Sequence, residues 1–267
     1  MKIQRIAGAL GTELLDIDLF APLTDVQVAE IRQALLDHCV IFFRDQTITP
    51  DQQVAFARAF GEIVDYPMIK PLPNHPEIIP VVKEAHETVN FGGLWHTDTA
   101  YLAEPPLGSI LLAKSVPPFG GDTLFANGYL AYEALSDGLK AALAPLRGVN
   151  RSGGASVAKT RGAGAKADEK SAIHPVIRTH PETGRKSLYV NLAHTYRFDG
   201  MTEAESAPLL GYLFQHQIRP EFTCRFSWRE GSMAFWDNRC ALHNPINDYH
   251  GHRRVMHRIT IAGDTPV

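Results

Sequence analysis

The sequence has few cysteines and no long apolar run, and both absences narrow what the chain can be. Its 267 residues hold three cysteines, Cys39, Cys224 and Cys240, which is an odd number spread along the chain. They form neither a disulfide framework nor a cysteine metal cluster, so we expect a reducing, cytoplasmic environment. No apolar run approaches the roughly 20 residues of a membrane-spanning helix. Acidic residues interrupt the N-terminal apolar stretch, so we expect neither export nor a membrane partner.

An excess of positive charge is also missing. The formal net charge is −3 and the pI is about 6.5, so no basic face is indicated and we expect no nucleic-acid partner. We find no internal repeat, no glycine-rich nucleotide loop and no βαβ alternation, which disfavours a Rossmann fold. With 45% hydrophobic residues, a chain of this length can bury an ample core. We therefore expect one domain over residues 1–267.

The first sixty residues predict two helices and one strand. Helical spacing of apolar residues predicts a helix over Val26–Leu36, with Thr24 as its N-cap. The apolar run Val40–Phe43 is typical of a buried strand. A second helix is predicted from Thr49 through Phe60, with a proline in its first turn. We expect these elements to flank the core rather than form it.

Short β-like runs between Pro/Gly turns dominate the rest of the chain. They are Ile78–Val82, Gly108–Ala113, Thr123–Ala126, Ser187–Val190, Thr223–Trp228, Ser232–Trp236 and Arg254–Ile261. One further helix is predicted at Glu203–Gln217. Many short strands at irregular spacing indicate a sandwich or jelly roll.

The segment Arg151–Ala172 differs from its surroundings. It is rich in Gly, Ala, Ser and Lys and has almost no large apolar side chains, so it buries too little surface to offset its ordering entropy. Such an insert is either a linker or a functional lid. Because β-like patterning resumes after it, we favour a flexible lid.

Three residues form a candidate metal site. His96 and Asp98 stand two residues apart and, in an extended segment, project to the same face. His243, which follows an apolar strand, is the best third ligand. Its rivals are His250, His252 and His257, of which the first two lie in a glycine-containing turn and are more typical of exposed histidines. Two imidazoles and one carboxylate make the facial triad of non-haem Fe(II) oxygenases, which leaves three positions on the metal open.

Two arginines strengthen this interpretation. Arg254 and Arg258 share parity in a predicted strand, and the short connection from His243 predicts that this histidine lies opposite them on a neighbouring strand. Guanidinium groups bind carboxylates in a bidentate way, so two arginines beside a metal suit a dicarboxylate. The alternative is that one arginine, Arg253 or Arg254, makes a structural ion pair with Asp237 or Asp248.

Together these motifs resemble the taurine dioxygenase/2,4-dichlorophenoxyacetate dioxygenase family of Fe(II)- and 2-oxoglutarate-dependent oxygenases. The strings that carry the resemblance are Trp95–Asp98, Pro117–Thr123, His174–Pro181, Trp236–Arg239 and Arg253–Arg258, and it extends back to Leu10–Glu13. The resemblance implies an α+β, mainly β fold, with a double-stranded β-helix (jelly-roll) core and flanking helices. It also implies a homo-oligomer, either a dimer or a tetramer.

The resemblance further implies roles for individual residues and a set of cofactors: Fe(II), 2-oxoglutarate and O2. The implied iron ligands, which form the catalytic centre, are His96, Asp98 and His243. Arg254 would hold the distal carboxylate of 2-oxoglutarate, and Thr123 would donate a hydrogen bond to the same molecule. Arg258 would lie beside the metal and co-substrate and pair with the anionic end of the substrate.

The implied reaction is hydroxylation of a small organic acid with release of succinate and CO2. Gly92 stands where the taurine enzyme has a polar contact, and Tyr66 and His194 stand where it has other substrate-facing residues. Together with Phe91 and Tyr196, Tyr66 and His194 suggest an aromatic-lined pocket, although each also suits ordinary packing. We therefore expect a carboxylate, sulfonate or sulfate ester with an apolar or aromatic body.

Two other functions stay open at this stage. One is another jelly-roll metalloenzyme, a hydrolase or isomerase, which needs no 2-oxoglutarate. The other is a non-catalytic sensor of 2-oxoglutarate or metal. Formation of succinate that depends on 2-oxoglutarate would separate the three hypotheses.

Overall fold

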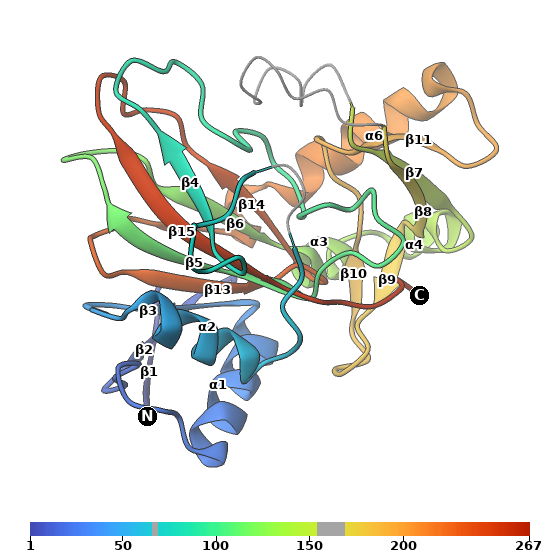
Figure 1. Cartoon of the computed structure of the whole chain (residues 1–267). Helices are drawn as coiled ribbons and strands as arrows, with labels where there is room; N and C mark the ends of the chain where they lie inside the picture. Colours follow the sequence, from blue (N-terminus) through green and yellow to red (C-terminus); the bar gives the residue numbers. More distant parts are fainter. Residues whose placement is uncertain (66–68, 154–168) are drawn as a thin grey trace.

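The computed structural model describes residues 1–65, 69–153 and 169–267, and Figure 1 shows its arrangement. The expected α+β, mainly β class is confirmed, since two antiparallel sheets face one another and helices flank them. No helix in the described part of the chain is long and apolar enough to cross a membrane.

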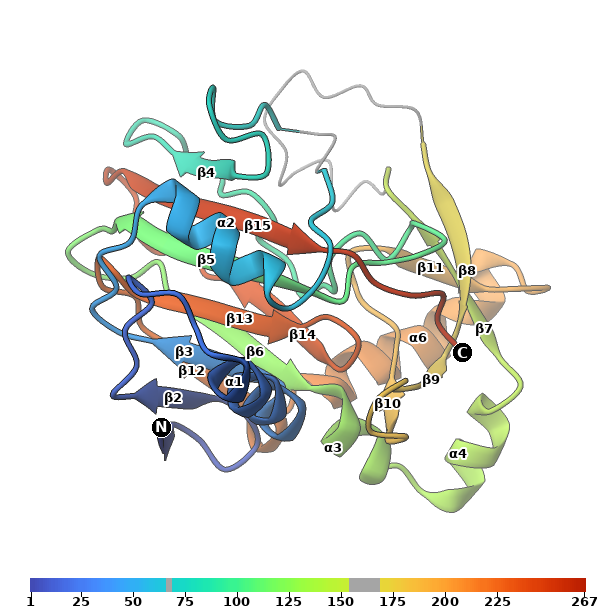
Figure 2. The same cartoon turned by 60° about the horizontal axis from the view of Figure 1, so that its bottom comes forward.

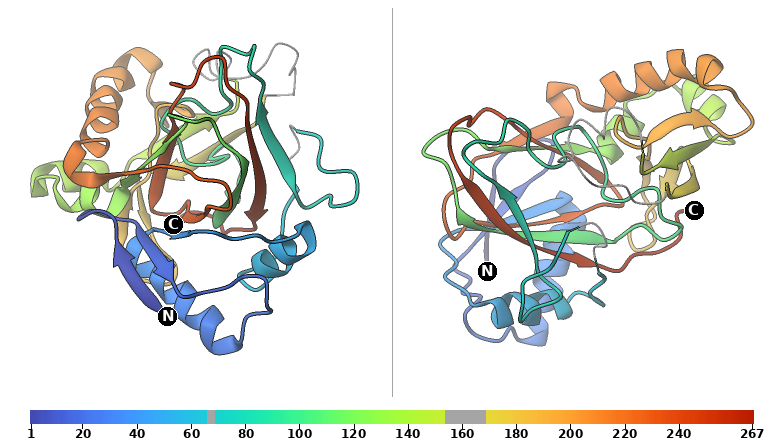
Figure 3. Two further views of the ribbon diagram at one scale, coloured as in Figure 1. Left: turned by 90° about the vertical axis from the view of Figure 1, so that its left-hand side faces the viewer. Right: turned by 45° about the horizontal axis from the view of Figure 1, so that its top comes forward.

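The larger sheet has seven strands. In spatial order they are β1 (Lys2–Arg5), β2 (Thr12–Leu15), β3 (Val40–Phe43), β13 (Met233–Asp237), β5 (Gly108–Ser115), β15 (Arg254–Ile261) and β4 (Ile79–Lys83). All neighbours are antiparallel except β2 and β3. The facing sheet has the order β12 (Thr223–Phe226), β6 (Thr123–Asn127) and β14 (Ala241–Pro245). Figure 3 shows strands of both sheets around a common interior.

Two N-terminal helices, α1 (Asp25–His38) and α2 (Pro50–Arg58), cover the outer face of the large sheet (Figure 2). Each begins at a threonine whose hydroxyl accepts a backbone N–H, in a capping box with a glutamine. The predicted cap at Thr24 and the proline in the first turn of α2 are confirmed.

The remaining elements lie beside the two sheets. They are α3 (Gly128–Glu133), α4 (Asp137–Leu143), α6 (Glu203–Gln217), η1 (Pro220–Phe222), the sheet β11 (Thr195–Phe198), β7 (Arg147–Arg151) and β8 (Ser171–Pro175), and the hairpin β9 (Ile177–Thr179) and β10 (Lys186–Leu188). The predicted lid at 151–172 begins and ends in paired strands, since Arg151 pairs with Ser171. Its residues 154–168 lie outside the described part of the chain, so the lid stays a prediction.

Strand β3 shows how alternation builds the core. Ile41 and Phe43 face the helices, whereas Val40 and Phe42 face the smaller sheet. The ring of Phe42 stacks on Phe226 with centroids 3.9 Å apart. The expectation that the first sixty residues only flank the core was therefore wrong, because β3 lies inside the large sheet. Its four residues are all fully buried, which an internal strand requires.

Candidate metal centre

The two histidines of the predicted site come together through a backbone bridge. His96 lies in an irregular segment and His243 in β14, yet each backbone N–H donates to the carbonyl of the other, at 3.0 and 2.9 Å. The imidazole centroids are consequently only 4.1 Å apart. A turn begins at Asp98, directly after the bridge. The structure thus brings together side chains that are about 145 positions apart in sequence, through local pairing.

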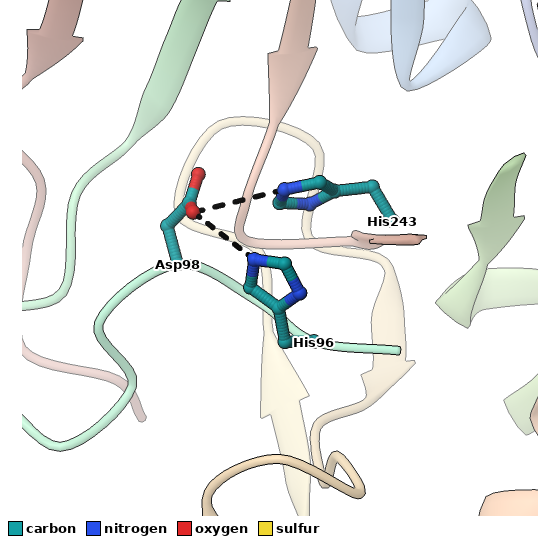
Figure 4. A group of neighbouring side chains, drawn as sticks. All are labelled: His96, Asp98 and His243. Atoms are coloured by element: carbon teal, nitrogen blue, oxygen red, sulfur yellow. Dashed lines mark ion pairs between the residues drawn. The ribbon is translucent and has the colours of Figure 1, made fainter. Parts of the chain in front are cut away.

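Figure 4 shows how the three side chains converge. The Nε2 atoms of His96 and His243 lie 3.5 and 3.7 Å from the same oxygen, Oδ1 of Asp98. One ligand atom from each residue lies within 4.8 Å of the others, and all three residues are buried. Two imidazole nitrogens and one carboxylate oxygen at this spacing fit a single divalent transition-metal ion.

The protonation states also suit a metal. Burial opposes ionisation of Asp98, but the charge of Arg258, with the two histidines, holds the pKa of its carboxyl well below the usual range. Burial, and then the neighbouring His96, holds the pKa of His243 well below its usual value, which favours the neutral imidazole. The Nδ1 atom of His96 lies 2.7 Å from the carbonyl of Leu94, so a proton there leaves Nε2 with its lone pair.

Neighbouring side chains hold the carboxylate of Asp98 in place. Its Oδ2 accepts hydrogen bonds from the Ser109 hydroxyl at 2.9 Å and from Arg258 Nη2 at 2.9 Å. Arg258 Nη2 also donates to Ser109 Oγ at 3.0 Å. Oδ1 is left facing the two imidazoles. Asn238 Oδ1 accepts from the Trp236 indole at 3.0 Å and, weakly, from the Asp98 backbone at 3.4 Å.

A cavity opens beside the two histidines. Its described lining residues are Val81, Phe91, Gly92, His96, Leu111, Thr123, Trp236, His243, Pro245, Arg254 and Arg258. Thr123 Oγ1 accepts a hydrogen bond from the Trp228 indole at 3.0 Å, which leaves the hydroxyl hydrogen available to a ligand. The side chains that line this cavity are mostly apolar, and the charged ones are arginines.

Arg254 is buried and has no counter-ion among the described residues. Its side chain is 6% exposed, and its Nε and Nη2 atoms find no hydrogen-bond acceptor among the described residues. Burial lowers the pKa of this guanidinium. An unpartnered buried cation costs free energy, so this position favours an anion in the cavity.

The alternative of a structural ion pair for this arginine was wrong. Asp237 pairs instead with Arg239 at 2.6 Å, and Asp248 faces Arg225 at 3.6 Å. The prediction of neighbouring strands was also wrong. His243 on β14 and Arg254 on β15 belong to different sheets, and they meet across the interior.

Only some of the predicted substrate contacts line the cavity. Phe91 and Gly92 line the cavity. His194 is not among its described lining residues, and its ring lies edge-on to His96 with centroids 6.3 Å apart. Tyr66 lies outside the described residues. Gly92 has φ +74°, and a Cβ there would lie 3.2 Å from Cε1 of His96, so this position lies directly against the imidazole.

None of the three rival histidines, His257 included, joins the metal group among the described residues. Within the described ranges, the ligand-forming group comprises the three predicted residues, without His250 or His252. His252 packs on the ring of Phe119 instead, with centroids 5.0 Å apart. Ser109 and Trp228 were not predicted as site residues, because a serine in a strand and a tryptophan at a strand end belong to no recognisable sequence motif.

Comparison with known proteins identifies one family. A model of the "Taurine catabolism dioxygenase TauD, TfdA family" matches residues 2–260. An alkylsulfatase of Acinetobacter baylyi is 34% identical over 99% of this chain and 86% of its own length. An alpha-ketoglutarate-dependent sulfate ester dioxygenase of Pseudomonas putida is 33% identical over 100% of this chain and 91% of that protein. An alpha-ketoglutarate-dependent 2,4-dichlorophenoxyacetate dioxygenase of Cupriavidus pinatubonensis is 33% identical over 97% and 96%.

Solved structures agree with this result. A taurine dioxygenase from Burkholderia xenovorans superposes with a TM-score of 0.87 at 38% identity, over 100% of this chain and 92% of that one. AAD-2, solved in complex with Mn(II) and N-oxalylglycine, gives a TM-score of 0.83 at 30% identity, over 99% and 98% of the two chains.

Proposed function

Because the chain belongs to the TauD, TfdA family of taurine catabolism dioxygenases, we propose that His96, Asp98 and His243 are its iron ligands and that Arg254 and Thr123 hold 2-oxoglutarate. The reaction class follows from the family: the protein is a 2-oxoglutarate-dependent non-haem Fe(II) dioxygenase that acts on a small anionic substrate. Its cofactor is Fe(II) and its co-substrates are 2-oxoglutarate and O2.

One observation carries the residue assignment: a group of two imidazoles and one carboxylate shares a cavity with a buried arginine. Two imidazole nitrogens and Asp98 Oδ1 converge at one end of the cavity. Arg254, which lacks an acceptor among the described residues, lies on the same cavity. 2-Oxoglutarate has a metal-chelating 2-oxo acid at one end and a carboxylate at the other, so it matches both ends.

Each part of the chain has a separate task in this proposal. When bound, Fe(II) supplies the activation of O2 that couples decarboxylation of 2-oxoglutarate to substrate oxidation, with succinate and CO2 as products. Arg254 and Thr123 orient the co-substrate. Ser109 and Arg258 hold Asp98 so that Oδ1 faces the metal position. The apolar lining excludes water from the reacting end of the cavity.

We propose further that the substrate is an acid with an apolar or aromatic body, such as an alkyl sulfate or an aryloxyalkanoate. Val81, Phe91, Leu111 and Pro245 supply apolar surface, and no carboxylate is present among the described lining residues. A primary ammonium group, as in taurine, would therefore be desolvated without an anionic partner. Relatives that act on sulfate esters and on 2,4-dichlorophenoxyacetate support this range.

Arg258 contacts both a proposed iron ligand and the cavity. Arg258 Nη2 lies 2.9 Å from the Asp98 carboxylate, and its side chain also lines the cavity in which we propose that an anion binds. A substitution here would disturb the carboxylate ligand as well as any substrate anion. Loss of activity in Arg258→Ala therefore does not isolate a role in substrate binding.

The metal assignment is tested with single variants. We predict that His243→Ala or Asp98→Ala abolishes Fe(II)-dependent succinate formation and high-affinity Fe(II) binding, while the circular dichroism spectrum stays that of the wild type. His250→Ala, an exposed histidine near the same strand, is the control and should keep both activities. Normal Fe(II) binding by His243→Ala would contradict the assignment.

A dimeric or tetrameric state and a cytoplasmic location stay predictions. Light scattering of the purified protein measures the first, and cell fractionation measures the second.

A further inference from the structure

A second buried cation lies next to Arg254. Lys83 is the last residue of β4, and in the antiparallel pairing with β15 it stands directly opposite Arg254. Directly opposed residues project from the same face of a sheet, with Cβ atoms about 4.5–5.5 Å apart. The two side chains therefore enter the same region of the interior.

Lys83 is buried without a hydrogen-bond partner. Its side chain is 3% exposed, and within the described part of the chain nothing accepts from Nζ. The ammonium group lies 4.5 Å from the centroid of the Tyr249 ring, which stabilises a cation but does not neutralise it. Like charges directly opposite each other destabilise a sheet, and here both are removed from water.

The next position along the same two strands shows the ordinary arrangement. Glu84 follows Lys83 on one strand, and Arg253 precedes Arg254 on the other. Their exposed side chains form an ion pair at 3.0 Å. The strands thus place opposite charges together on the solvent side and two positive charges together on the inner side. Such an inner pair needs an anion from elsewhere.

Two cavities beside this pair of cations offer space for an anion. A small cavity lined by Lys83, Asn90 and Tyr249 shares Val81, Phe91, Pro245 and Arg254 with the cavity beside the histidines. The two cavities therefore adjoin at Arg254. The carboxylate whose charge acts on Arg254 is that of Asp122. Its Oδ2 already accepts from Arg225 at 2.6 Å and from Ser227 at 3.0 Å.

We propose that Lys83 and Arg254 together bind the distal carboxylate of 2-oxoglutarate, and that Lys83 makes the site selective for 2-oxo dicarboxylates over 2-oxo monocarboxylates. This inference rests on the proposed function. Arg254 presents Nε and Nη2 to one carboxylate, and Lys83 adds a third donor and a second positive charge. A co-substrate without the distal carboxylate leaves both cations uncompensated.

The test uses Lys83→Met, which removes the charge and keeps a flexible stem of similar volume. The dissociation constant of 2-oxoglutarate is measured by its absorption band with the anaerobic Fe(II) protein, and 2-oxopentanoate, which lacks the distal carboxylate, is measured by competition. We expect the variant to bind 2-oxoglutarate about 10- to 100-fold more weakly and to bind 2-oxopentanoate as the wild type does. The metal-free variant should melt at a higher temperature, because an unpartnered buried charge is gone.

Lys114→Met is the matched control, since Lys114 is an exposed lysine on β5, which adjoins β15. It should change none of the three quantities. An unchanged affinity for 2-oxoglutarate in Lys83→Met, or an equal loss for both acids, would overturn the inference. A lower melting temperature would indicate a structural lysine and overturn it as well. Wild-type protein that binds no 2-oxoglutarate would overturn the proposed function itself, so the two failures are distinguishable.

Discussion

At the scale of single residues, the two oxygens of Asp98 have different neighbours, and this difference organises the site. Oδ1 faces the two imidazoles, while Oδ2 is held by Ser109 and Arg258. An oxygen that already accepts two hydrogen bonds is a poor metal ligand, so the arrangement favours one-oxygen coordination through Oδ1. It also fixes the carboxylate before any metal binds.

Ser109 therefore gives the sharpest residue-scale prediction. Ser109→Ala removes hydrogen bonds to both Asp98 and Arg258, and we expect Fe(II) affinity to fall about 10-fold or more. Fe(II) titration followed by calorimetry measures this. Ser115→Ala, at the other end of the same strand, should bind Fe(II) like the wild type. Equal affinities for Ser109→Ala and the wild type would show that Asp98 needs no such support.

What the sequence could predict at this scale follows from periodicity. The same-face pair His96 and Asp98 and the shared parity of Arg254 and Arg258 are visible because a strand alternates with period two. Lys83 was invisible, because the predicted strand ended at Val82 and lysine is rare in buried strands. Its burial depends on pairing with β15, which is a long-range property.

At the scale of elements, the turn between β13 and β14 positions His243, the proposed third ligand. Asp237 accepts hydrogen bonds from the backbone and guanidinium of Arg239, and its Oδ2 lies 3.0 Å from His180 Nε2. Although burial opposes ionisation, the hydrogen bonds and charge of Arg239, with His180, hold the pKa of Asp237 well below its usual range. The chain then enters β14, which carries His243.

This turn gives a prediction about pH. A carboxyl whose pKa is lowered on folding stabilises the protein fully above its unfolded pKa of about 3.9, and this contribution is lost as the pH falls below it. Asp237→Asn should therefore lower the free energy of unfolding by about 3 kcal/mol at pH 7, because Arg239 loses a buried partner. The difference from the wild type should shrink below about pH 4.

Urea unfolding at several pH values measures the difference, and Asp137→Asn at the exposed start of α4 is the control, with stability close to that of the wild type. A gap between Asp237→Asn and the wild type that does not change with pH would contradict the pKa shift. Equal stabilities at pH 7 would contradict the role of the turn.

The sequence could not predict which strands belong to the same sheet. The strand Arg254–Ile261 was predicted at its observed bounds, because eight consecutive residues of β-like composition give a long signal. His243 was expected on a strand, but β14 was not among the predicted strand ranges, since Ala241–Pro245 is short and ends in a proline. Its pairing with β6 rather than with β15 depends on contacts far apart in sequence, which local pattern does not encode.

At the scale of the whole molecule, the two facing sheets bring the proposed metal site and a cationic end to one cavity. β14 and the segment around His96 supply the first, and β15 with β4 supplies the second. The helices α1 and α2 cover the opposite face of the large sheet (Figure 2) and do not enter this region. In our proposal, the co-substrate and the substrate therefore bind in the interior between the sheets.

The central claim is that this interior couples 2-oxoglutarate to the oxidation of acids with apolar bodies. The most direct measurement is succinate formation with Fe(II), ascorbate and O2, as kcat/KM for alkyl sulfates, alkyl sulfonates, aryloxyalkanoates and taurine. We predict succinate formation that requires 2-oxoglutarate, with taurine at least about 10-fold below the best apolar acid, because its ammonium group finds no partner in the lining. Taurine as the best substrate, or turnover of these acids without 2-oxoglutarate, would contradict the account.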